Sequence, residues 1–470
     1  VTVENAGGYS SMIRNGGEAT ADCNLTIRGG NFTGGINTVK NDLFGVLTIN
    51  GGNFSNTAQY VIMNWNKAEI TAGTFQTLDT ASAVLFTSAF GSNANYVGEL
   101  TISGGEFKHA SDTQEMIVDH YDESNKGNAV VTGGKFDADI SKYIPTDYVQ
   151  SADGTVEKLG ETNAVAKVGG TYYKTLADAV AAAQDGDTIT LLKDAELTST
   201  LNLAKNITID GQGKYTIKAA NSFTVGSDNK TYCVLYVSGE VTLKDVTVNG
   251  NEKCRVIFCD KGKLTIDGAT ITNGKAPNFI GGVYMTSSAS FEMKSGSITG
   301  NKNAKGYQND EYLQYSSDLW IGANANGALT AINGGTIGNV FVNANAWSAS
   351  NPGSFTMNGG TVTNLYVEHD ANYGATFKYN DGTIEHLYLS KENGNGQSIE
   401  VTPVKGVIYN GGVKEQDLVT LTMKYNDGAT ADSTYNVASG TTITLPTPRR
   451  SGYTFNGWYD GSKFYAPRGP

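Results

Sequence analysis

The sequence predicts an all-β protein built from coils of short parallel strands, and three observations lead to this fold class. A glycine-rich phrase repeats along the chain, glycine is abundant while proline is scarce, and aromatic residues are plentiful. The chain has 58 Gly, 8 Pro, 25 Tyr and 17 Phe among its 470 residues. A disordered glycine-rich segment would usually be poor in aromatic residues. We therefore expect many short strands joined by tight turns.

The first repeated phrase lies within residues 25–136. Its five copies mostly resemble Leu-Thr-Ile-x-Gly-Gly-x-Phe, and they end at Phe32, Phe54, Phe75, Phe107 and Phe136. Apolar and polar residues alternate within each copy, which is the pattern of a half-buried strand. The Gly-Gly pair permits a sharp corner, because glycine adopts positive φ without a Cβ penalty.

A second series of related phrases places two short strands on either side of one glycine corner. Its copies occupy residues 264–271, 291–298, 329–337, 355–362 and 377–384. A unit that repeats every ~20–30 residues indicates a solenoid, in which each coil completes its core against its neighbours. Since no helix separates these strands, the pattern favours a parallel β-helix. A β-propeller, whose blades need ~40 residues, is the main alternative.

An amphipathic helix is expected over residues 171–183, where Leu176, Ala179, Val180 and Ala183 recur at helical spacing. This segment resembles the N-terminal capping helix of pectin-lyase-type right-handed parallel β-helices, in which it covers the open end of the first coil. The resemblance implies that a second β-helix starts near residue 163. Right-handed coils also agree with the general preference for right-handed parallel crossovers.

Two further segments resemble parts of bacterial surface proteins. Residues 139–156 are similar to the closing phrase of repeat regions in surface proteins of gut-type Gram-positive anaerobes. Residues 421–428, 441–446 and 450–459 resemble the Listeria–Bacteroides repeat, a small β-grasp-like module of internalins and many Gram-positive adhesins. In that family the closing phrase forms the core of the module, carried here by Gly452, Tyr453, Phe455, Gly457, Trp458 and Tyr459.

These resemblances imply a modular, exported cell-surface protein, and they name no ligand. The expected domains are a first β-helix segment at 1–160, a second β-helix at 161–415 and the repeat at 416–470. We expect the chain to be a fragment whose export signal and wall anchor lie outside it. No run of about 18 apolar residues occurs, so no transmembrane helix is expected. A net charge of -12 disfavours nucleic acid as a partner.

The four cysteines, Cys23, Cys233, Cys254 and Cys259, are sparse for a chain of this length. The favoured interpretation is free thiols, with Cys233 and Cys254 stacked inside neighbouring coils as small apolar residues. A disulfide remains an alternative. A metal site is disfavoured because the spacing matches no zinc pattern and no His lies nearby. No cofactor is expected.

A carbohydrate-active enzyme is one alternative function. A lyase needs a carboxylate cluster for Ca²⁺ and usually an Arg or Lys base. The second β-helix contains one arginine, Arg255, which lies in an apolar strand with no repeating acidic cluster beside it. In the first series, Asp119, His120 and Asp122 could bind a divalent ion, although a polar loop is the favoured interpretation.

A glycosidase needs two carboxylates about 5–9.5 Å apart. Alignment of the last two phrases pairs Asn364 with His386, so Glu368 and Asp370 approach Glu385 only across a corner. A solvated corner with scattered charges is the favoured interpretation. The sequence therefore predicts that the chain is not an enzyme.

The strongest binding candidate is the long coil between Gly296 and Gly335, which carries an insertion at residues 306–320. Loops on a rigid scaffold often carry function. Aromatic faces that stack on sugar rings, beside polar groups that bond hydroxyls, suggest a glycan site. The candidate residues are Tyr307, Asp310, Glu311, Tyr312, Tyr315 and Trp320, with Trp347 on the next enlarged corner. The alternative is that these aromatics pack onto the coil as a satellite core.

The sequence thus predicts a non-catalytic surface adhesin or interaction protein that contacts glycans or a host or bacterial surface protein. A purely structural stalk is a further alternative. The oligomeric state stays open.

Overall fold

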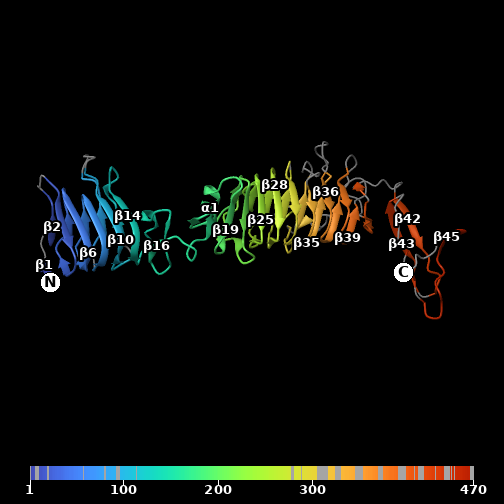
Figure 1. The fold of residues 1–470 in the computed structure, drawn as a ribbon, viewed down its shortest axis with the longest axis horizontal. Helices are drawn as coiled ribbons and strands as arrows, with labels where there is room; N and C mark the ends of the chain where they lie inside the picture. Colours follow the sequence, from blue (N-terminus) through green and yellow to red (C-terminus); the bar gives the residue numbers. More distant parts are fainter. Residues whose placement is uncertain are drawn as a thin grey trace. The chain divides into compact units, whose positions relative to one another are not determined.

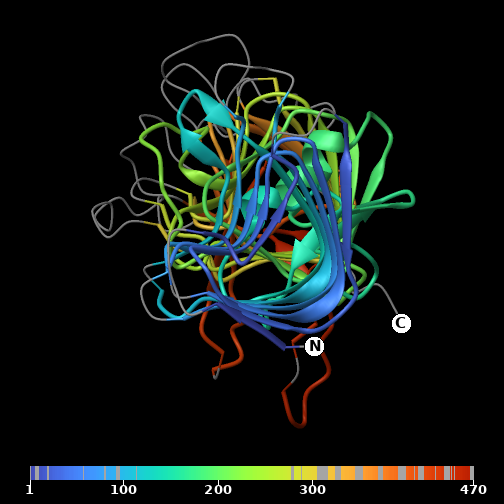
Figure 2. The same ribbon diagram turned by 90° about the vertical axis from the view of Figure 1, so that its left-hand side faces the viewer.

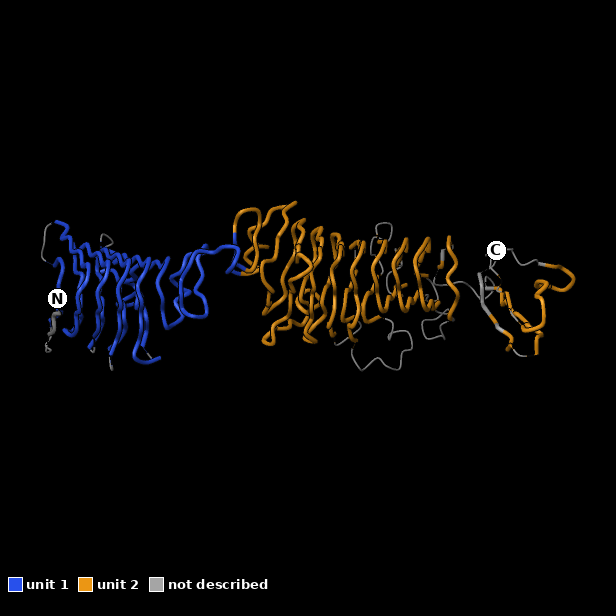
Figure 3. The backbone as a smooth tube through the Cα atoms, turned by 60° about the horizontal axis from the view of Figure 1, so that its bottom comes forward, with its two compact units in different colours: residues 1–164, 172–174 blue, residues 165–171, 175–470 orange. Residues whose placement is uncertain are grey.

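The computed structural model describes the chain except for residues 1, 6–9, 18–20, 57, 79–80, 91–95, 113, 277–279, 287, 304–315, 323–329, 345–352, 369–373, 390–398, 407, 411–417, 429, 439–444, 446, 449 and 466–470. It divides into two compact units (Figure 3). Unit 1 comprises residues 1–164 with 172–174, and unit 2 comprises residues 165–171 with 175–470. Strands make up most of the described structure (Figure 1), which confirms the predicted all-β class.

Unit 1 is a solenoid of parallel strands in two sheets. Sheet 1 has the order β1-β4-β6-β8-β10-β14, with β3 also paired to β6, and sheet 2 has the order β11-β9-β7-β5-β2. From β5 to β10 the chain alternates between the sheets, so each coil adds one strand to each. The stacked coils are visible end-on in Figure 2.

Among the described residues of unit 1, sheet 1 has seven strands and sheet 2 has five. Sheet 1 contains β1 (Thr2–Asn5), β3 (Cys23–Ile27), β4 (Asn31–Gly34), β6 (Gly45–Asn56), β8 (Lys67–Thr77), β10 (Glu99–Lys108) and β14 (Asn128–Phe136). Sheet 2 contains β2 (Ile13–Asn15), β5 (Asn37–Asn41), β7 (Tyr60–Asn64), β9 (Ala83–Thr87) and β11 (Glu115–Val118). Two antiparallel hairpins complete the unit, β12 (His120–Asp122) with β13 (Asn125–Lys126) and β15 (Tyr148–Gln150) with β16 (Val156–Lys158), and η1 (Ser141–Tyr143) is a 3-10 helix.

The repeated phenylalanines of unit 1 form a buried stack. Phe32, Phe54, Phe75, Phe107 and Phe136 occupy matching positions in sheet 1, and successive ring centroids lie 4.9, 5.0, 4.8 and 4.5 Å apart. This spacing follows the ~4.8 Å separation of neighbouring strands. In the first copy the Gly-Gly pair separates β3 from β4, as a corner between strands would, whereas in β6, β10 and β14 it lies inside one long strand. At its second glycine φ is positive, 114° at Gly52.

The second solenoid begins with β17 (Ala166–Val168), with β18 (Thr171–Tyr173), whose last two residues are counted in unit 1, and with helix α1 (Leu176–Ala182). The helix is shorter than predicted because its first expected residues form β18. It starts where the Thr175 hydroxyl accepts a hydrogen bond from the Asp178 amide at 3.1 Å. At its other end, Lys205 Nζ donates to the carbonyls of the last turn, those of residues 180, 181 and 183. Its buried face contacts β17 and β19, the first strands of the solenoid.

Two sheets build the solenoid of unit 2. Sheet 3 contains β18, β17, β19 (Thr188–Leu191), β22 (Ile207–Asp210), β25 (Glu240–Lys244), β28 (Lys263–Asp267), β31 (Ser290–Met293), β34 (Ala331–Ile332), β36 (Ser354–Met357), β38 (Thr376–Tyr379) and β41 (Ile408–Asn410). Sheet 4 contains β20 (Ala195–Leu197), β23 (Thr216–Ala219), β26 (Thr247–Asn249), β29 (Thr270–Thr272), β32 (Ser297–Ile298), β21 (Leu201–Leu203), β24 (Cys233–Val237), β27 (Arg255–Cys259), β30 (Val283–Met285), β33 (Leu319–Ile321), β35 (Thr336–Val342), β37 (Thr361–Val367), β39 (Thr383–Leu389) and β40 (Ile399–Val401).

The number of sheet 4 strands in each coil of unit 2 changes along the stack. In the early coils two short strands of sheet 4 follow each strand of sheet 3, whereas later coils merge them into one long strand. The change occurs at β35, which pairs with β32 through its first residues and with β33 through its last. At the two ends, β17 pairs antiparallel with β19, and β40 and β41 pair antiparallel with β39 and β38. These antiparallel strands therefore cover the sheet edges on which another parallel strand could otherwise pair.

The C-terminal region forms two antiparallel hairpins, β42 (Leu418–Met423) with β43 (Ser433–Ala438) and β44 (Trp458–Asp460) with β45 (Lys463–Tyr465). None of the helices in the described part of the chain has the length and apolar character needed to span a membrane.

Candidate functional site

Most of the predicted ligand residues lie outside the described residues. This holds for Tyr307, Asp310, Glu311, Tyr312, Tyr315 and Trp347. Trp320, in β33, is the one predicted residue that the structure places. The binding role of the whole set stays a prediction. The structure does describe the residues at the two ends of the inserted segment.

The two ends of the insertion are joined through the buried carboxylate of Asp318. Its Oδ1 accepts hydrogen bonds from the Asn301 amide nitrogen at 3.1 Å and from Asn301 Nδ2 at 2.8 Å. Its Oδ2 accepts from the amide of Asn339 at 2.9 Å and from the Ser317 hydroxyl at 3.2 Å. Burial raises the pKa of Asp318, and these hydrogen bonds oppose that rise. The carboxylate thus fixes the two points between which the inserted segment runs.

An aromatic side chain occupies the same position on seven successive coils of sheet 4. We call this column the aromatic ladder: Tyr236, Phe258, Tyr284, Trp320, Phe341, Tyr366 and Tyr388. Each ring follows one residue after a buried aliphatic side chain of the solenoid core. Because side chains alternate along a strand, the ladder lies on the face opposite that core.

The middle of the aromatic ladder is closely packed. The ring centroids of Trp320 and Phe341 are 4.2 Å apart, and those of Phe341 and Tyr366 are 5.1 Å apart. These three side chains and Ile280 form a cluster separate from the solenoid core, with Trp320 only 8% exposed. The ring of Trp320 is therefore a packed member of a satellite cluster in this structure.

The aromatic ladder was not predicted from the sequence, although its signal is present there. Each coil carries an aliphatic residue, then an aromatic, then another apolar residue, as in Leu235-Tyr236-Val237 and Leu365-Tyr366-Val367. These triplets are separated by segments of different length, so no fixed period reveals them. Strand pairing alone brings them into line.

Arg255 lies beside the early part of the aromatic ladder. Its side chain is buried, with Nε donating to the Ile280 carbonyl at 3.1 Å and Nη1 donating to Asn229 Oδ1 at 3.2 Å. The guanidinium carbon lies 4.9 Å from the ring centroid of Tyr284. Desolvation lowers the pKa of Arg255. The guanidinium of Arg255 therefore lies over the ring of Tyr284, and its hydrogen bonds connect the loops of Asn229 and Ile280 to the aromatic ladder.

The cysteines are free thiols, as the sequence analysis favoured. Cys233, Cys254 and Cys259 are buried, and desolvation raises the pKa of each thiol to about 12. The expected stacking of Cys233 on Cys254 is wrong. Cys233 pairs in register with Arg255, because strand β27 begins at Arg255, one residue after Cys254.

The acids considered for a glycosidase have structural contacts where they are described. The predicted pairing of Asn364 with His386 is confirmed. Glu368 Oε2 accepts hydrogen bonds from Asn343 Nδ2 at 2.6 Å and from the amide of Ala344 at 2.8 Å. Asp370 lies outside the described residues, and the absence of enzyme activity stays a prediction.

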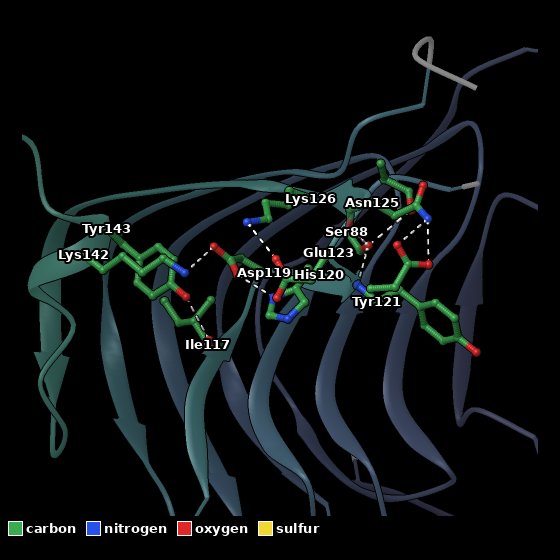
Figure 4. Close-up of polar contacts among 12 residues, drawn as sticks. Ser88, Ile117, Asp119, His120, Tyr121, Glu123, Asn125, Lys126, Lys142 and Tyr143 are labelled. Atoms are coloured by element: carbon green, nitrogen blue, oxygen red, sulfur yellow. Dashed lines mark hydrogen bonds and ion pairs between the residues drawn. The ribbon is translucent and has the colours of Figure 1, made fainter. Parts of the chain in front are cut away.

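In unit 1, Asp119, His120 and Asp122 occupy the loop that includes hairpin β12–β13 (Figure 4). Asp119 forms an ion pair with Lys142 Nζ at 2.7 Å and contacts His120 Nδ1 at 3.0 Å. Burial raises the pKa of Asp119, but hydrogen bonds from Lys142 and His120 outweigh it and lower the pKa. The described residues contain no group of three or more His, Cys, Asp or Glu side chains able to hold a metal.

The comparisons with known proteins concern the C-terminal region. Residues 420–467 match the Listeria-Bacteroides repeat domain, which confirms that resemblance. Such domains are typical of surface proteins, and the repeat together with the solenoid fits a surface-type repeat protein. No curated protein and no solved structure matched the chain.

Within this repeat the expected core is only partly correct. Trp458 contacts Phe455 and Tyr425, with ring centroids 5.6 and 5.4 Å away. Tyr453 and Tyr459, which the resemblance placed in the core, are 68% and 64% exposed. Each has a partner at the surface: the Arg450 guanidinium lies over Tyr453, and Phe464 packs on Tyr459 across hairpin β44–β45.

Proposed function

We propose that the chain is a non-catalytic, cell-surface interaction protein whose second solenoid presents the segment between Asn301 and Asp318 to a glycan. The observation that carries this proposal is the buried, fully hydrogen-bonded Asp318 carboxylate at the base of the insertion. A loop that starts from a fixed base loses less conformational freedom on binding than a loose one.

The composition of the segment supports a glycan as the ligand. Three tyrosines lie within residues 307–315, together with Asn and acidic residues that can bond sugar hydroxyls. The aromatic ladder gives the end of the segment a packed base, because Trp320 follows Asp318 by two residues and stacks on Phe341. In this proposal the three tyrosines contact the sugar, and the packed ring of Trp320 anchors the described end of the segment.

A non-catalytic role is part of the same proposal. The described carboxylates near this region, Asp318 and Glu368, are engaged as acceptors of structural hydrogen bonds. A general acid or nucleophile needs a carboxyl group that is open to substrate.

A glycan array probed with the whole chain tests the proposal, with release of reducing ends measured on every glycan bound. We expect binding without release, and we expect the double variant Tyr312→Ala, Tyr315→Ala to lose binding while its melting temperature is unchanged. Product release would establish an enzyme instead. Binding that survives the double variant would remove this segment as the site.

A further inference from the structure

A second group of aromatic side chains lies in unit 1, at the corner where each strand of sheet 2 leads to a strand of sheet 1. The successive coils bring Phe44, Trp65, Phe90, Tyr96 and Tyr121 to this corner, and we call them the aromatic corner. The connecting segments differ in length: they are residues 42–44 after β5, 65–66 after β7, 88–98 after β9 and 119–127 after β11.

Buried amide side chains give this corner a rigid base. Asn15 Nδ2 donates to Asn41 Oδ1 at 2.9 Å, Asn41 Nδ2 donates to Asn64 Oδ1 at 2.8 Å, and Asn64 Nδ2 donates to Thr87 Oγ1 at 3.1 Å. Asn41 Nδ2 also reaches the carbonyls of Gly45 and residue 67. Each amide therefore ties its own turn to the next coil, which fixes where the corner residues start.

The rings contact one another across the coils. Trp65 lies on the buried Phe86, with centroids 5.0 Å apart, and contacts Phe90 at 5.4 Å and Tyr121 at 6.2 Å. Trp65 itself is 8% exposed, whereas Phe90 is 45% and Tyr121 is 72% exposed. The two outer rings thus flank a covered indole and present much of their surface to solvent.

Hydrogen bonds hold the backbone at each of the two exposed rings, and at Tyr121 the partner is Ser88. The Ser88 hydroxyl accepts a hydrogen bond from the Tyr121 amide at 2.9 Å and donates to the Asn125 carbonyl at 2.7 Å, which holds hairpin β12–β13 against the preceding coil (Figure 4). The Phe90 amide donates to the Tyr96 carbonyl at 2.9 Å, which pairs these two residues. The backbone amide of each ring-bearing residue is therefore hydrogen-bonded.

Polar groups suited to sugar hydroxyls lie beside Tyr121. The Asp122 carboxylate accepts from Asn125 Nδ2 at 2.9 and 2.8 Å and from the Ser124 amide at 2.9 Å, which holds the carboxylate in one orientation. Neighbouring Glu123 and Lys126 form an exposed ion pair at 3.3 Å. Exposed rings beside fixed acceptors and donors offer the combination that binds the apolar face and the hydroxyls of a sugar.

We propose that the aromatic corner is a second carbohydrate-binding site, which takes a neutral glycan through stacking on Phe90 and Tyr121. Acidic side chains at 122 and 123 and the net charge of -12 oppose a polyanionic ligand. The site lies in unit 1 and shares no residue with the inserted segment of unit 2, so it does not depend on the function proposed for that segment.

The test uses the whole chain on an array of neutral and acidic oligosaccharides, followed by calorimetric titration with the best neutral ligand. We expect neutral glycans to bind, and we expect Tyr121→Ala and Phe90→Ala each to weaken binding by about tenfold. Tyr121→Phe, which keeps the ring, should retain most of the affinity. Tyr453→Ala is the matched control, since Tyr453 is similarly exposed but lies in the C-terminal repeat.

Three outcomes would overturn the proposal. These are the absence of neutral-glycan binding by the chain, unchanged affinity in both alanine variants, and self-association in sedimentation experiments that Tyr121→Ala abolishes. The third outcome would make the corner an interface between two copies of the chain. Loss of binding in Tyr312→Ala, Tyr315→Ala with the corner variants unaffected would support the unit 2 segment alone, so the two proposals fail separately.

Discussion

Trp320 and Phe341 stack almost parallel on neighbouring coils of unit 2, with ring centroids 4.2 Å apart and planes inclined by 19°. Their strands, β33 and β35, pair in register at these two residues. The contact joins the coil that carries the long insertion to the first coil in which two strands of sheet 4 merge. Its aromatic packing therefore stabilises the solenoid at the place where the coil geometry changes.

The first prediction concerns this stack. Trp320→Ala should lower the free energy of unfolding by about 3 kcal/mol, because it removes a large ring from a packed cluster. Trp320→Phe, which keeps a ring against Phe341, should cost less than half as much. Urea unfolding of the whole chain followed by circular dichroism measures both. An unchanged transition in Trp320→Ala would show that the ring contributes no packing, and would favour the predicted ligand role of Trp320.

The second prediction concerns pH and Asp318. Burial raises its pKa above the ordinary 3.8, so the folded state holds a proton over a pH range in which the unfolded state has released it. Its contribution to stability is therefore fully present below pH 3.8 and declines as pH rises through the raised pKa. Asp318→Asn lacks this titration, so the stability difference between wild type and variant should be largest at acid pH and shrink as pH rises.

The same variant should still be less stable than wild type near neutral pH. An amide group offers one acceptor oxygen in place of two, so at least one of the buried donors of Asn301 and Asn339 loses its partner, at a cost of about 1–3 kcal/mol. Thermal unfolding between pH 3.5 and 8 measures both effects. A difference that grows with pH would show that the carboxyl pKa is lowered in the fold rather than raised.

The third prediction concerns the amide side chains beneath the aromatic corner. Asn41→Ala removes a buried group that bonds Asn15, Asn64 and two carbonyls, and should destabilise unit 1 by about 3 kcal/mol. Asn53→Ala is the matched control, because the bond from Asn53 to Asn31 is exposed and should contribute little. Equal effects of the two variants in thermal unfolding would contradict a structural role for the buried amides.

Much of the solenoid could be predicted because residues at the same position of the repeated phrase pair with one another in the sheet. Phe32 and Phe54 occur in the same phrase, and strand pairing places them in contact. The aromatic corner could not be predicted this way. Trp65 follows its strand at once, whereas Tyr121 lies in a nine-residue connection, and connections outside the sheets carry no constraint on length. Sequence shows which residues lie in the strands, and the structure shows which corner residues meet.

The start of the helix illustrates the same limit. The periodic pattern extended back to Thr171, but residues 171–173 pair as a strand because that edge of sheet 3 offers unpaired backbone groups. The helix begins only where Thr175 caps it. Local propensity alone did not distinguish helix from strand at residues 171–173, because pairing with sheet 3 determines their conformation.

The last prediction concerns the thiols. Cys233, Cys254 and Cys259 are buried with pKa values near 12, whereas Cys23 is half-buried. Since the thiolate is the nucleophile, only Cys23 should react readily with a thiol reagent in the native protein at pH 8. Mass spectrometry after brief labelling should show one modification, and labelling in urea should show four. Cys23→Ser should abolish the native reaction. Two modifications in urea instead of four would show that two of the cysteines form a disulfide, and rapid native labelling at Cys233 would contradict the burial of the solenoid interior beside Arg255.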